Sequence, residues 1–299
     1  MSDHTIATRV GHLRVQETAG RDLPAAVLWH SLFVDERTWQ RVLPDLAQHR
    51  RLVVITGPGH GLSTDPGHRY SMDDCADAAL EVLDALEVAG PVDWVGNAWG
   101  GHVGLTVAAR HPQRVRTLVT CGTPLHPYSW ASRVQTNLLL VLYRLLGPTR
   151  LITNAVVDAL LSQRTRSTDT AATDLVRDCF VSANRTRMAN AVVSISLKRV
   201  DMKPLLTIRV PTLFITGSEH PDWTPDQMRA AAQRLPRGST AVLDGTAYLG
   251  PLEAPDRFRD LVRDFWAAHP APGQRERPNR TANDPGPGSP ARALHTEMP

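Results

Sequence analysis

The strongest constraint on the fold of this 299-residue chain is an alternation of short apolar runs with segments of helical periodicity. The runs are almost continuously apolar, which suits strands that are covered on both faces, as in a parallel sheet. Strands that alternate with helices at this spacing predict a doubly wound α/β fold. The predicted buried strands span residues 25–29, 52–55, 92–95, 118–120, 212–215 and 240–243.

Further elements extend this sheet and cover it. Residues 5–9 and 12–17 predict an opening hairpin because both runs are strand-like and a glycine separates them. Ser71, followed three residues later by Asp74, resembles a capping box and marks the start of a helix. Two more helices are expected over residues 224–235 and 254–269.

Two segments interrupt the alternation of strands and helices. Residues 123–208 are mostly helical in period, and an insertion of this size after the sixth strand predicts a helical lid over the carboxyl ends of the strands. Residues 270–299 contain seven prolines and too little apolar surface to order themselves, so a disordered tail is expected. The core is then formed by residues 1–122 and 209–269.

Composition excludes several classes of protein. Hydrophobic residues make up 42% of the chain, and the formal charge is only +3 without any basic run, so neither nucleic acid nor a membrane is expected as a partner. The most apolar run, at 137–147, is well short of a ~20-residue membrane span. No secretory signal is recognised at the N-terminus, and three irregularly spaced cysteines form no disulfide framework. We therefore expect a cytoplasmic protein.

Five segments resemble motifs of the α/β-hydrolase superfamily, in the order and spacing of that family and across residues 5–269. The resemblance implies a mostly parallel, twisted sheet flanked by helices, with a helical lid after strand 6. HSLFVDERTW (30–39) is similar to the oxyanion loop, ITGPGHGLSTDP (55–66) to the D-x-P-G-H-G-x-S loop, GNAWGG (96–101) to the G-x-S-x-G elbow, PTLFITGSEHPDWTP (211–225) to the acid-bearing strand, and LDGTAYLGPLEAPDRF (243–258) to the histidine-bearing stretch.

The resemblance implies that all three positions of the catalytic triad are replaced. Family triads run nucleophile, acid, histidine along the chain. The nucleophile position is held by Ala98, the acid position by His220 and the histidine position by Tyr248. Acyl transfer by a triad needs a hydroxyl, an imidazole and a carboxylate, so conventional serine-hydrolase chemistry is not expected.

Nearby residues are candidates to replace the lost groups. Glu219 and Asp222 flank His220, so either carboxylate is a candidate substitute for the acid. The candidate substitutes for the base are His126, at the start of the lid, and His102, in the helix after the elbow. Glu253 is expected to cap or anchor the final helix.

The elbow backbone is intact even though its nucleophile is missing. By resemblance, the N–H groups of Leu32 and Trp99 form an oxyanion hole, which stabilises any developing oxyanion. Ser31, Asn97 and His126 are candidates to line the pocket. No cluster has metal-ligand spacing and no phosphate-binding loop follows the first strand, so neither a metal nor a cofactor is expected.

Three functional interpretations remain open, and the expected partner is a small-molecule ligand or substrate. His220 and Tyr248 would be hydrogen-bonded neighbours in the family geometry, which favours an acid–base enzyme of the lyase, cyclase or isomerase type on a small, largely apolar carbonyl compound. A catalytically inactive pseudo-hydrolase that binds a ligand or a partner is the second. A hydrolase that activates water through His126 or His220 is the third. The oligomeric state is not predicted.

Overall fold

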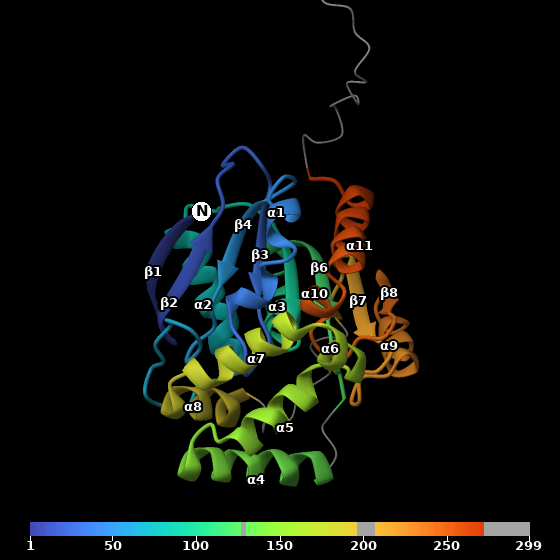
Figure 1. Cartoon of the computed structure of the whole chain (residues 1–299). Coiled ribbons are helices and arrows are strands. Elements are labelled where there is room, and N and C mark those ends of the chain that lie inside the picture. The colour runs from blue at the N-terminus through green and yellow to red at the C-terminus, as the bar shows by residue number, and fades with distance from the viewer. Residues whose placement is uncertain (127–129, 196–206, 272–299) are drawn as a thin grey trace, which may run out of the picture. The chain divides into compact units, whose positions relative to one another are not determined.

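A single eight-stranded sheet organises the protein, in the order β1-β2-β4-β3-β5-β6-β7-β8 (Figure 1). The computed structural model describes residues 1–126, 130–195 and 207–271. The first two strands pair antiparallel, β2 is antiparallel to β4, and the remaining strand pairs are parallel. The strands are β1 Ser2–Thr8, β2 Gly11–Glu17, β3 Ala25–Trp29, β4 Arg51–Ile55, β5 Val92–Asn97, β6 Val115–Cys121, β7 Thr212–Gly217 and β8 Gly238–Leu243. The predicted fold class is confirmed.

Helices cover both faces of the sheet. Alternate strand residues point to opposite sides, so each face carries its own set of apolar side chains that helices bury. On one face, Trp29 and Trp94 pack in the cluster that includes α2 (Met72–Ala85), α3 (Trp99–Arg110) and α9 (Pro225–Ala232). On the other face, residues such as Leu28 pack with α1 (Leu43–Leu46) and α11 (Pro255–Ala268). Both faces are therefore apolar, which explains the almost continuous apolar character of the strands.

Capping residues set the helix boundaries that the sequence indicates. Ser71 and Asp74 form the predicted capping box at the start of α2, each side chain bonding the other residue's backbone N–H. Thr224 and Gln227 form a second capping box at the start of α9. These contacts satisfy N–H groups that the first helical turn leaves without partners.

Among the described residues between β6 and β7, where a lid is predicted, the chain forms five helices: α4 Trp130–Leu146, α5 Arg150–Leu160, α6 Gln163–Thr168, α7 Thr170–Ser182 and α8 Arg185–Ile195. They lie across the carboxyl ends of β3 and β4 and belong to the same compact unit, Met1–His269, as the sheet (Figure 1). Thr149, Ser162 and Asp169 are the N-cap residues of α5, α6 and α7, and the side chain of each accepts a hydrogen bond from a backbone N–H of the first turn. These caps set where each short helix begins. Residues 127–129 and 196–206 of the predicted lid lie outside the described residues, as does the predicted disordered tail from residue 272 onward.

Across the described ranges, no helix combines the length and the apolarity that crossing a bilayer requires.

A buried carboxylate ties together the amino-terminal ends of the central strands. Asp93 on β5 is fully buried and accepts hydrogen bonds from Arg50 Nε at 2.6 Å, Arg116 Nε at 3.0 Å and Thr117 Oγ1 at 2.5 Å. The Arg50 guanidinium lies 4.7 Å from the centre of the Trp266 ring on α11. The cluster therefore links β5 and β6 to a helix on the sheet's surface.

We expect Asp93→Ala to lower the free energy of unfolding by about 3–5 kcal/mol, because it leaves the buried Arg50 charge without its partner. Urea denaturation measures this loss. The matched control is Asp84→Ala, which removes an exposed carboxylate that pairs with Arg114 at 3.0 Å and is expected to cost less than ~1 kcal/mol. Equal effects of the two substitutions would contradict the role given to the buried cluster.

Candidate functional site

The turn between β5 and α3 is sharp, and Ala98 stands at its tip. Ala98 has φ 47° and ψ −102°, a conformation that costs a non-glycine residue free energy, and its N–H donates to Cys121 O at 2.7 Å. Glycines make the turn possible: a Cβ on Gly100 would lie 1.9 Å from the Trp29 carbonyl oxygen, and one on Gly96 would lie 2.2 Å from Gly100. At the tip, where the fold's serine enzymes carry the reactive hydroxyl, this chain has a methyl group.

Two buried histidines hold the loop that faces the elbow. His30 accepts a hydrogen bond from Gly57 N–H at Nε2 (2.8 Å), so its Nδ1 is the protonated nitrogen and donates to Ser31 O at 2.6 Å. His60 is arranged the same way, accepting from Phe33 N–H at 3.3 Å and donating to Pro58 O at 3.0 Å. Burial lowers the pKa of both, to about 3 for His60, so both are neutral and structural.

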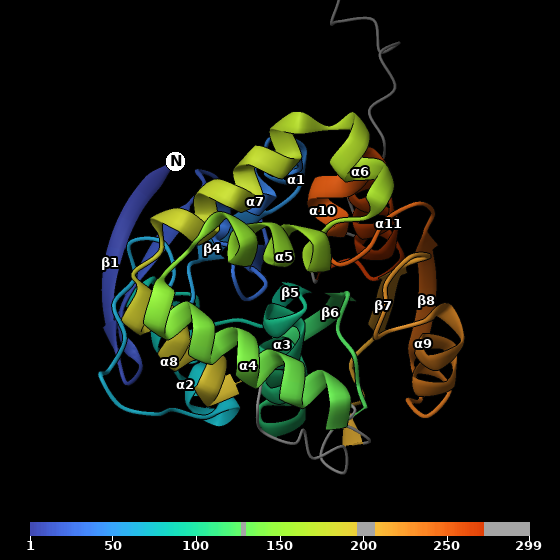
Figure 2. The same cartoon turned by 60° about the horizontal axis from the view of Figure 1, so that its bottom comes forward.

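The backbone N–H groups of Leu32 and Trp99 are the predicted oxyanion donors. Trp99 is the first residue of α3, so its N–H has no helical partner. Leu32 lies between Ser31, whose carbonyl His30 holds, and Phe33, which has φ 68°. The end of β5 and the start of α3 are seen between α4 and α5 in Figure 2. The oxyanion hole itself stays a prediction.

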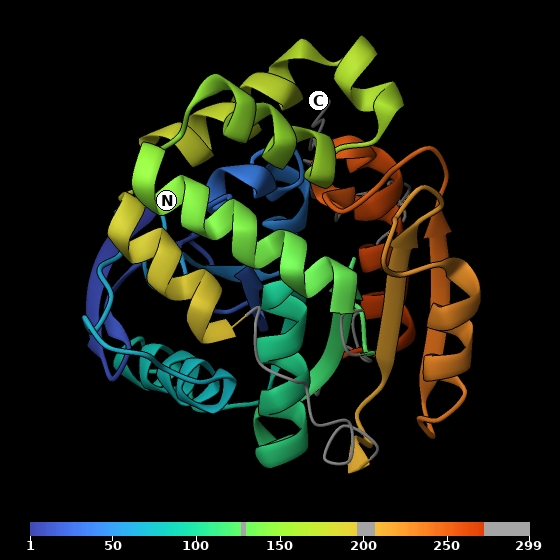
Figure 3. The same cartoon turned by 90° about the horizontal axis from the view of Figure 1, so that it is seen from below.

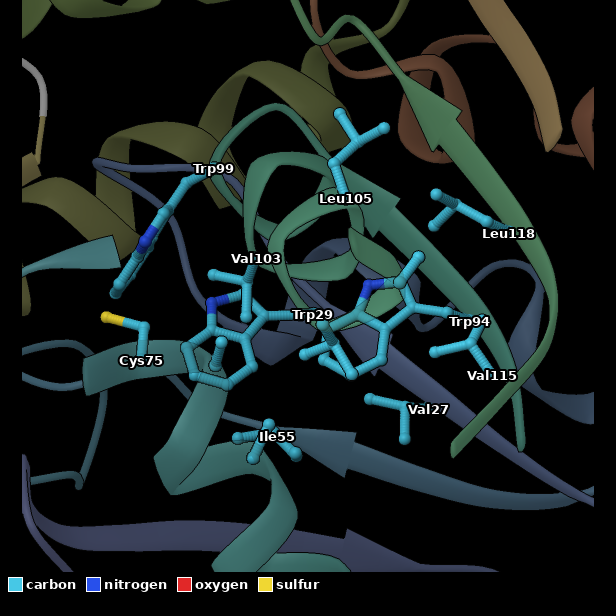
Figure 4. Packing of buried hydrophobic residues seen from close by; sticks show 14 of the residues in the cluster. Val27, Trp29, Ile55, Cys75, Trp94, Trp99, Val103, Leu105, Val115 and Leu118 are labelled. Carbon is cyan, nitrogen blue, oxygen red and sulfur yellow. The ribbon is translucent and has the colours of Figure 1, made fainter. Parts of the chain in front are cut away.

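The Trp99 side chain points into the core. Its ring centre lies 5.4 Å from that of Trp29, nearly perpendicular to it (Figure 4). It also lies 5.2 Å from the ring centre of His60. Glycine at position 57 leaves the room that the indole needs, since a Cβ there would lie 2.4 Å from the ring. The indole therefore braces the elbow, and the backbone N–H of Trp99 stays the candidate for contact with a ligand.

His220 and Tyr248 are in contact, but through their faces. The ring centres are 3.8 Å apart, with planes tilted by 41°. The expected hydrogen bond between them is replaced by two others: the Tyr248 hydroxyl donates to Asp222 Oδ2 at 2.8 Å, and His220 Nδ1 accepts from Asp222 N–H at 3.2 Å. The physical reason is that residues 220–222 turn back on themselves, which places the carboxylate two residues beyond His220 nearest to the phenol.

His220 is built as a neutral imidazole. Its side chain is buried, and burial lowers its pKa to about 3. Because Nδ1 accepts a hydrogen bond, Nε2 carries the proton. Nε2 faces Gly122, whose backbone interacts with it electrostatically, although the pair makes no hydrogen bond of regular geometry. His220 is therefore uncharged at neutral pH.

The remaining candidates surround this group. Asn97 uses both amide protons, donating to Cys121 O at 3.0 Å and to Tyr248 O at 2.8 Å. His126 Nε2 lies 2.6 Å from Asp222 O and its ring lies against Trp223. Asn97 thus binds the backbone of Tyr248 directly beside the elbow, and His126 holds the backbone of the residue that accepts the Tyr248 hydroxyl. Glu219 is exposed, and Asp222 is the flanking carboxylate that joins the group.

Glu253 anchors the loop that carries Tyr248. Its Oε1 accepts from Ala247 N–H at 2.9 Å and Leu249 N–H at 3.1 Å, the residues on either side of Tyr248. Its Oε2 accepts from Ser162 N–H at 2.8 Å, at the start of α6. The expectation that Glu253 caps the final helix is wrong, because the cap residue of α11 is Ala254, without a side-chain hydrogen bond. Sequence showed the carboxylate but not which chain segment would fold back to it.

We expect Ala98→Gly to raise the free energy of unfolding by up to about 1 kcal/mol, because glycine removes the backbone strain at this turn and loses part of the gain to chain entropy. Differential scanning calorimetry measures the change. The matched control, Ala109→Gly within α3, is expected to lower stability by about 1 kcal/mol. If both substitutions destabilise equally, the turn at residue 98 is not strained.

We expect the protein to lose stability in acid through its buried imidazoles. Unfolded histidine titrates near pH 6.5, whereas burial lowers the pKa of His60 and His220 to about 3 and of His102 to about 4. Protons therefore bind the unfolded state first, so stability is complete above pH 6.5 and falls as the pH drops toward 3. Urea midpoints at about pH 7.5 and 5 measure the slope. His102→Leu should flatten it, and the exposed His49→Leu should not.

Comparison with known proteins places the chain in a family. The model of the alpha/beta hydrolase fold family matches residues 27–255. The 2-hydroxymuconate semialdehyde hydrolase of Pseudomonas sp. (strain CF600) is 44% identical over 86 residues, which is 28% of this chain and only 30% of that relative. The pyrrolizixenacetamide deacetylase of Xenorhabdus hominickii is 25% identical over 269 residues, 88% of this chain and 98% of that protein.

A solved structure agrees with these matches. The enol-lactonase from Burkholderia xenovorans LB400 superposes with a TM-score of 0.81 at 25% identity, covering 88% of this chain and 100% of that one. The family match extends over the strands β3 to β8 and the elbow between β5 and α3. This chain therefore belongs to the α/β-hydrolase fold family.

Proposed function

We propose that this protein is an acid–base enzyme acting on a small, largely apolar carbonyl compound, by elimination, cyclisation or isomerisation and without a covalent intermediate. One observation carries the proposal: the hydrogen bond of 2.8 Å from the Tyr248 hydroxyl to the Asp222 carboxylate. It lies beside an elbow whose tip residue, Ala98, has no nucleophile.

The three triad positions argue against the hydrolytic route of the family. Ala98 offers no attacking oxygen, and Tyr248 stands where an imidazole would take the proton of that oxygen. His220 stands where a carboxylate would orient the imidazole, and it is neutral because burial lowers its pKa to about 3. An acyl–enzyme has no residue on which to form at the elbow.

A proton relay is the chemistry that the remaining groups support. The Tyr248 oxygen would take a proton from a carbon next to the substrate carbonyl while its own proton passes to Asp222 Oδ2. The electron pair left on carbon would move onto the carbonyl oxygen as an enolate, which the N–H groups of Leu32 and Trp99 would stabilise. Return of the proton to another atom would complete an isomerisation.

The other candidates act on this pair rather than on the substrate. His220 holds the Asp222 backbone and packs against the Tyr248 ring, so we assign it a positioning role. Asn97 and Glu253 fix the Tyr248 backbone from two sides. Proton transfer depends on the separation of the exchanging atoms, so several fixed contacts around one phenol favour catalysis over passive filling of space.

The substrate class rests on two further observations. Tyr248 packs against the apolar cluster of the lid helices, together with Phe33, which suits a largely apolar compound. The names of two relatives, a semialdehyde hydrolase and an enol-lactonase, refer to substrates with a carbonyl group or an enol oxygen. Compounds that enolise are therefore the first to test.

We expect the protein to exchange carbon-bound hydrogen for deuterium in a panel of enolisable ketones, 1,3-dicarbonyls and enol lactones in D₂O, followed by NMR. Tyr248→Phe and Asp222→Asn should each slow the exchange by at least about 100-fold, because general acid–base groups contribute 10²–10⁴-fold. Matched controls are Tyr143→Phe, which removes a buried hydroxyl without a hydrogen bond, and the exposed Asp226→Asn. Both should leave the rate unchanged.

The same samples separate the alternatives. Thermal-shift binding of panel members without exchange or turnover would support a ligand-binding pseudo-hydrolase and overturn the proposal. Hydrolysis of an ester probe that survives Ala98→Gly but is lost in His126→Ala would support water activation instead. Labelling of residue 98 by a fluorophosphonate is expected to be absent throughout.

A further inference from the structure

The lid carries an apolar surface that faces away from the rest of the protein. Ten large hydrophobic side chains are exposed among the described residues, and seven of them lie between positions 134 and 151. We call these seven the outer lid face: Val134, Leu138, Val141, Leu142, Leu145, Leu146 and Leu151. Leu145 is 72% exposed and Leu151 is 80% exposed, so most of the surface of each side chain is in contact with solvent.

Helical spacing gathers these residues into one stripe. Val134, Leu138, Val141 and Leu145 follow each other at intervals of four, three and four, which places them on one side of α4. Leu140 and Tyr143 on the other side are buried and join the lid's own core. α4 is thus apolar both inward and outward. It is the outermost helix of the lid, as Figure 3 shows from below.

Unpaired positive charge borders the outer lid face. Arg144, Arg150 and Arg185 are exposed, and none of them forms an ion pair within the described residues. The Arg185 guanidinium lies next to Gly147, at the end of α4. The chain contains no Asp or Glu from residue 94 to residue 157, and α8 has none either. On α5, Asp158 pairs with Arg166.

We propose that the outer lid face docks on an anionic phospholipid bilayer, lying in the interface plane without spanning it. A helix with an apolar face and bordering arginines is the usual arrangement for binding at the headgroup boundary. Phosphate groups would supply the anions that Arg144, Arg150 and Arg185 lack among the described residues. The expectation that no membrane is a partner came from the small net charge of the whole chain, which averages out this local charge.

Other occupants fit the surface less well. A second copy of the chain would add a second set of these arginines, and the single carboxylate of the α4–α5 hairpin, Asp158, already pairs with Arg166, so like charges would meet. Residues 272–299 contain only Leu294 and Met298 as large hydrophobics, too few to cover seven exposed side chains. The charge of the border therefore selects the lipid surface.

Co-sedimentation of the full chain with vesicles tests the proposal. Binding is expected to vesicles of equimolar phosphatidylcholine and phosphatidylglycerol, weakly or not at all to phosphatidylcholine alone, and less as salt rises. The double variant Leu138→Gln/Leu145→Gln should lose binding by at least about tenfold, since it removes two inserted side chains. Arg144→Gln/Arg150→Gln should lose the preference for the anionic vesicles.

All four substituted side chains are exposed, so the variants should fold, and circular dichroism checks that they do. The matched control is Leu62→Gln, which removes a leucine that is 75% exposed outside the outer lid face and should leave binding unchanged. Three outcomes overturn the proposal: no binding to anionic vesicles, binding that the leucine substitutions do not affect, or a dimer in light scattering that these substitutions dissociate without any vesicle binding. None of these readouts depends on the proposed enzymatic activity.

Discussion

The close contact between Gly100 and the carbonyl of Trp29 is the constraint on which the centre of the molecule depends. No side chain fits there, and the first turn of α3 can therefore rest directly on β3. Gly100 N–H donates to His30 O at 3.2 Å, and the indole Nε1 of Trp94 donates to Gly100 O at 2.9 Å. Once α3 starts at this point, Ala98 must bridge from β5 with a positive φ.

This dependence explains how the backbone of the turn can keep its shape with alanine at its tip. The glycines of the turn serve the packing of α3 on the sheet, so any loss of them would cost the fold as well as the site. The hydroxyl of a serine at the tip would serve chemistry alone. A methyl group at the tip, as in Ala98, therefore leaves the backbone, and the N–H groups at the start of α3, where the fold requires them.

The same site shows how far sequence reasoning could reach. Strands, elbow and helix caps could be predicted because each depends on residues close in the chain: an apolar run, a glycine that a close approach requires, or a Ser71–Asp74 pair. The contact of the His220 and Tyr248 rings followed from the family resemblance. The bond from Tyr248 to Asp222 did not, because it is decided by a shift of two residues within one loop.

Long-range partners were equally inaccessible from the sequence. The sequence assigns Glu253 to the final helix, whereas its partners on the Tyr248 loop and at Ser162 depend on how the lid packs on the core. The apolar run at 137–147 was visible too, and its periodicity fits either a buried or an exposed face. Which face of a helix is covered is decided by its neighbours in space, and only the structure places α4 at the outside of the lid.

Glu253 finally connects the two parts of the protein that the proposals concern. One oxygen holds the backbone on both sides of Tyr248, and the other holds the start of α6 and the Thr165 hydroxyl at 3.0 Å. A partly buried carboxylate that loses some of its donors is left with polar atoms that are neither bonded nor fully hydrated, so moving α6 away would weaken the anchor of the Tyr248 loop as well. The position of the lid and the position of the phenol are therefore not independent, even though the outer lid face and the site lie on opposite sides of the lid helices.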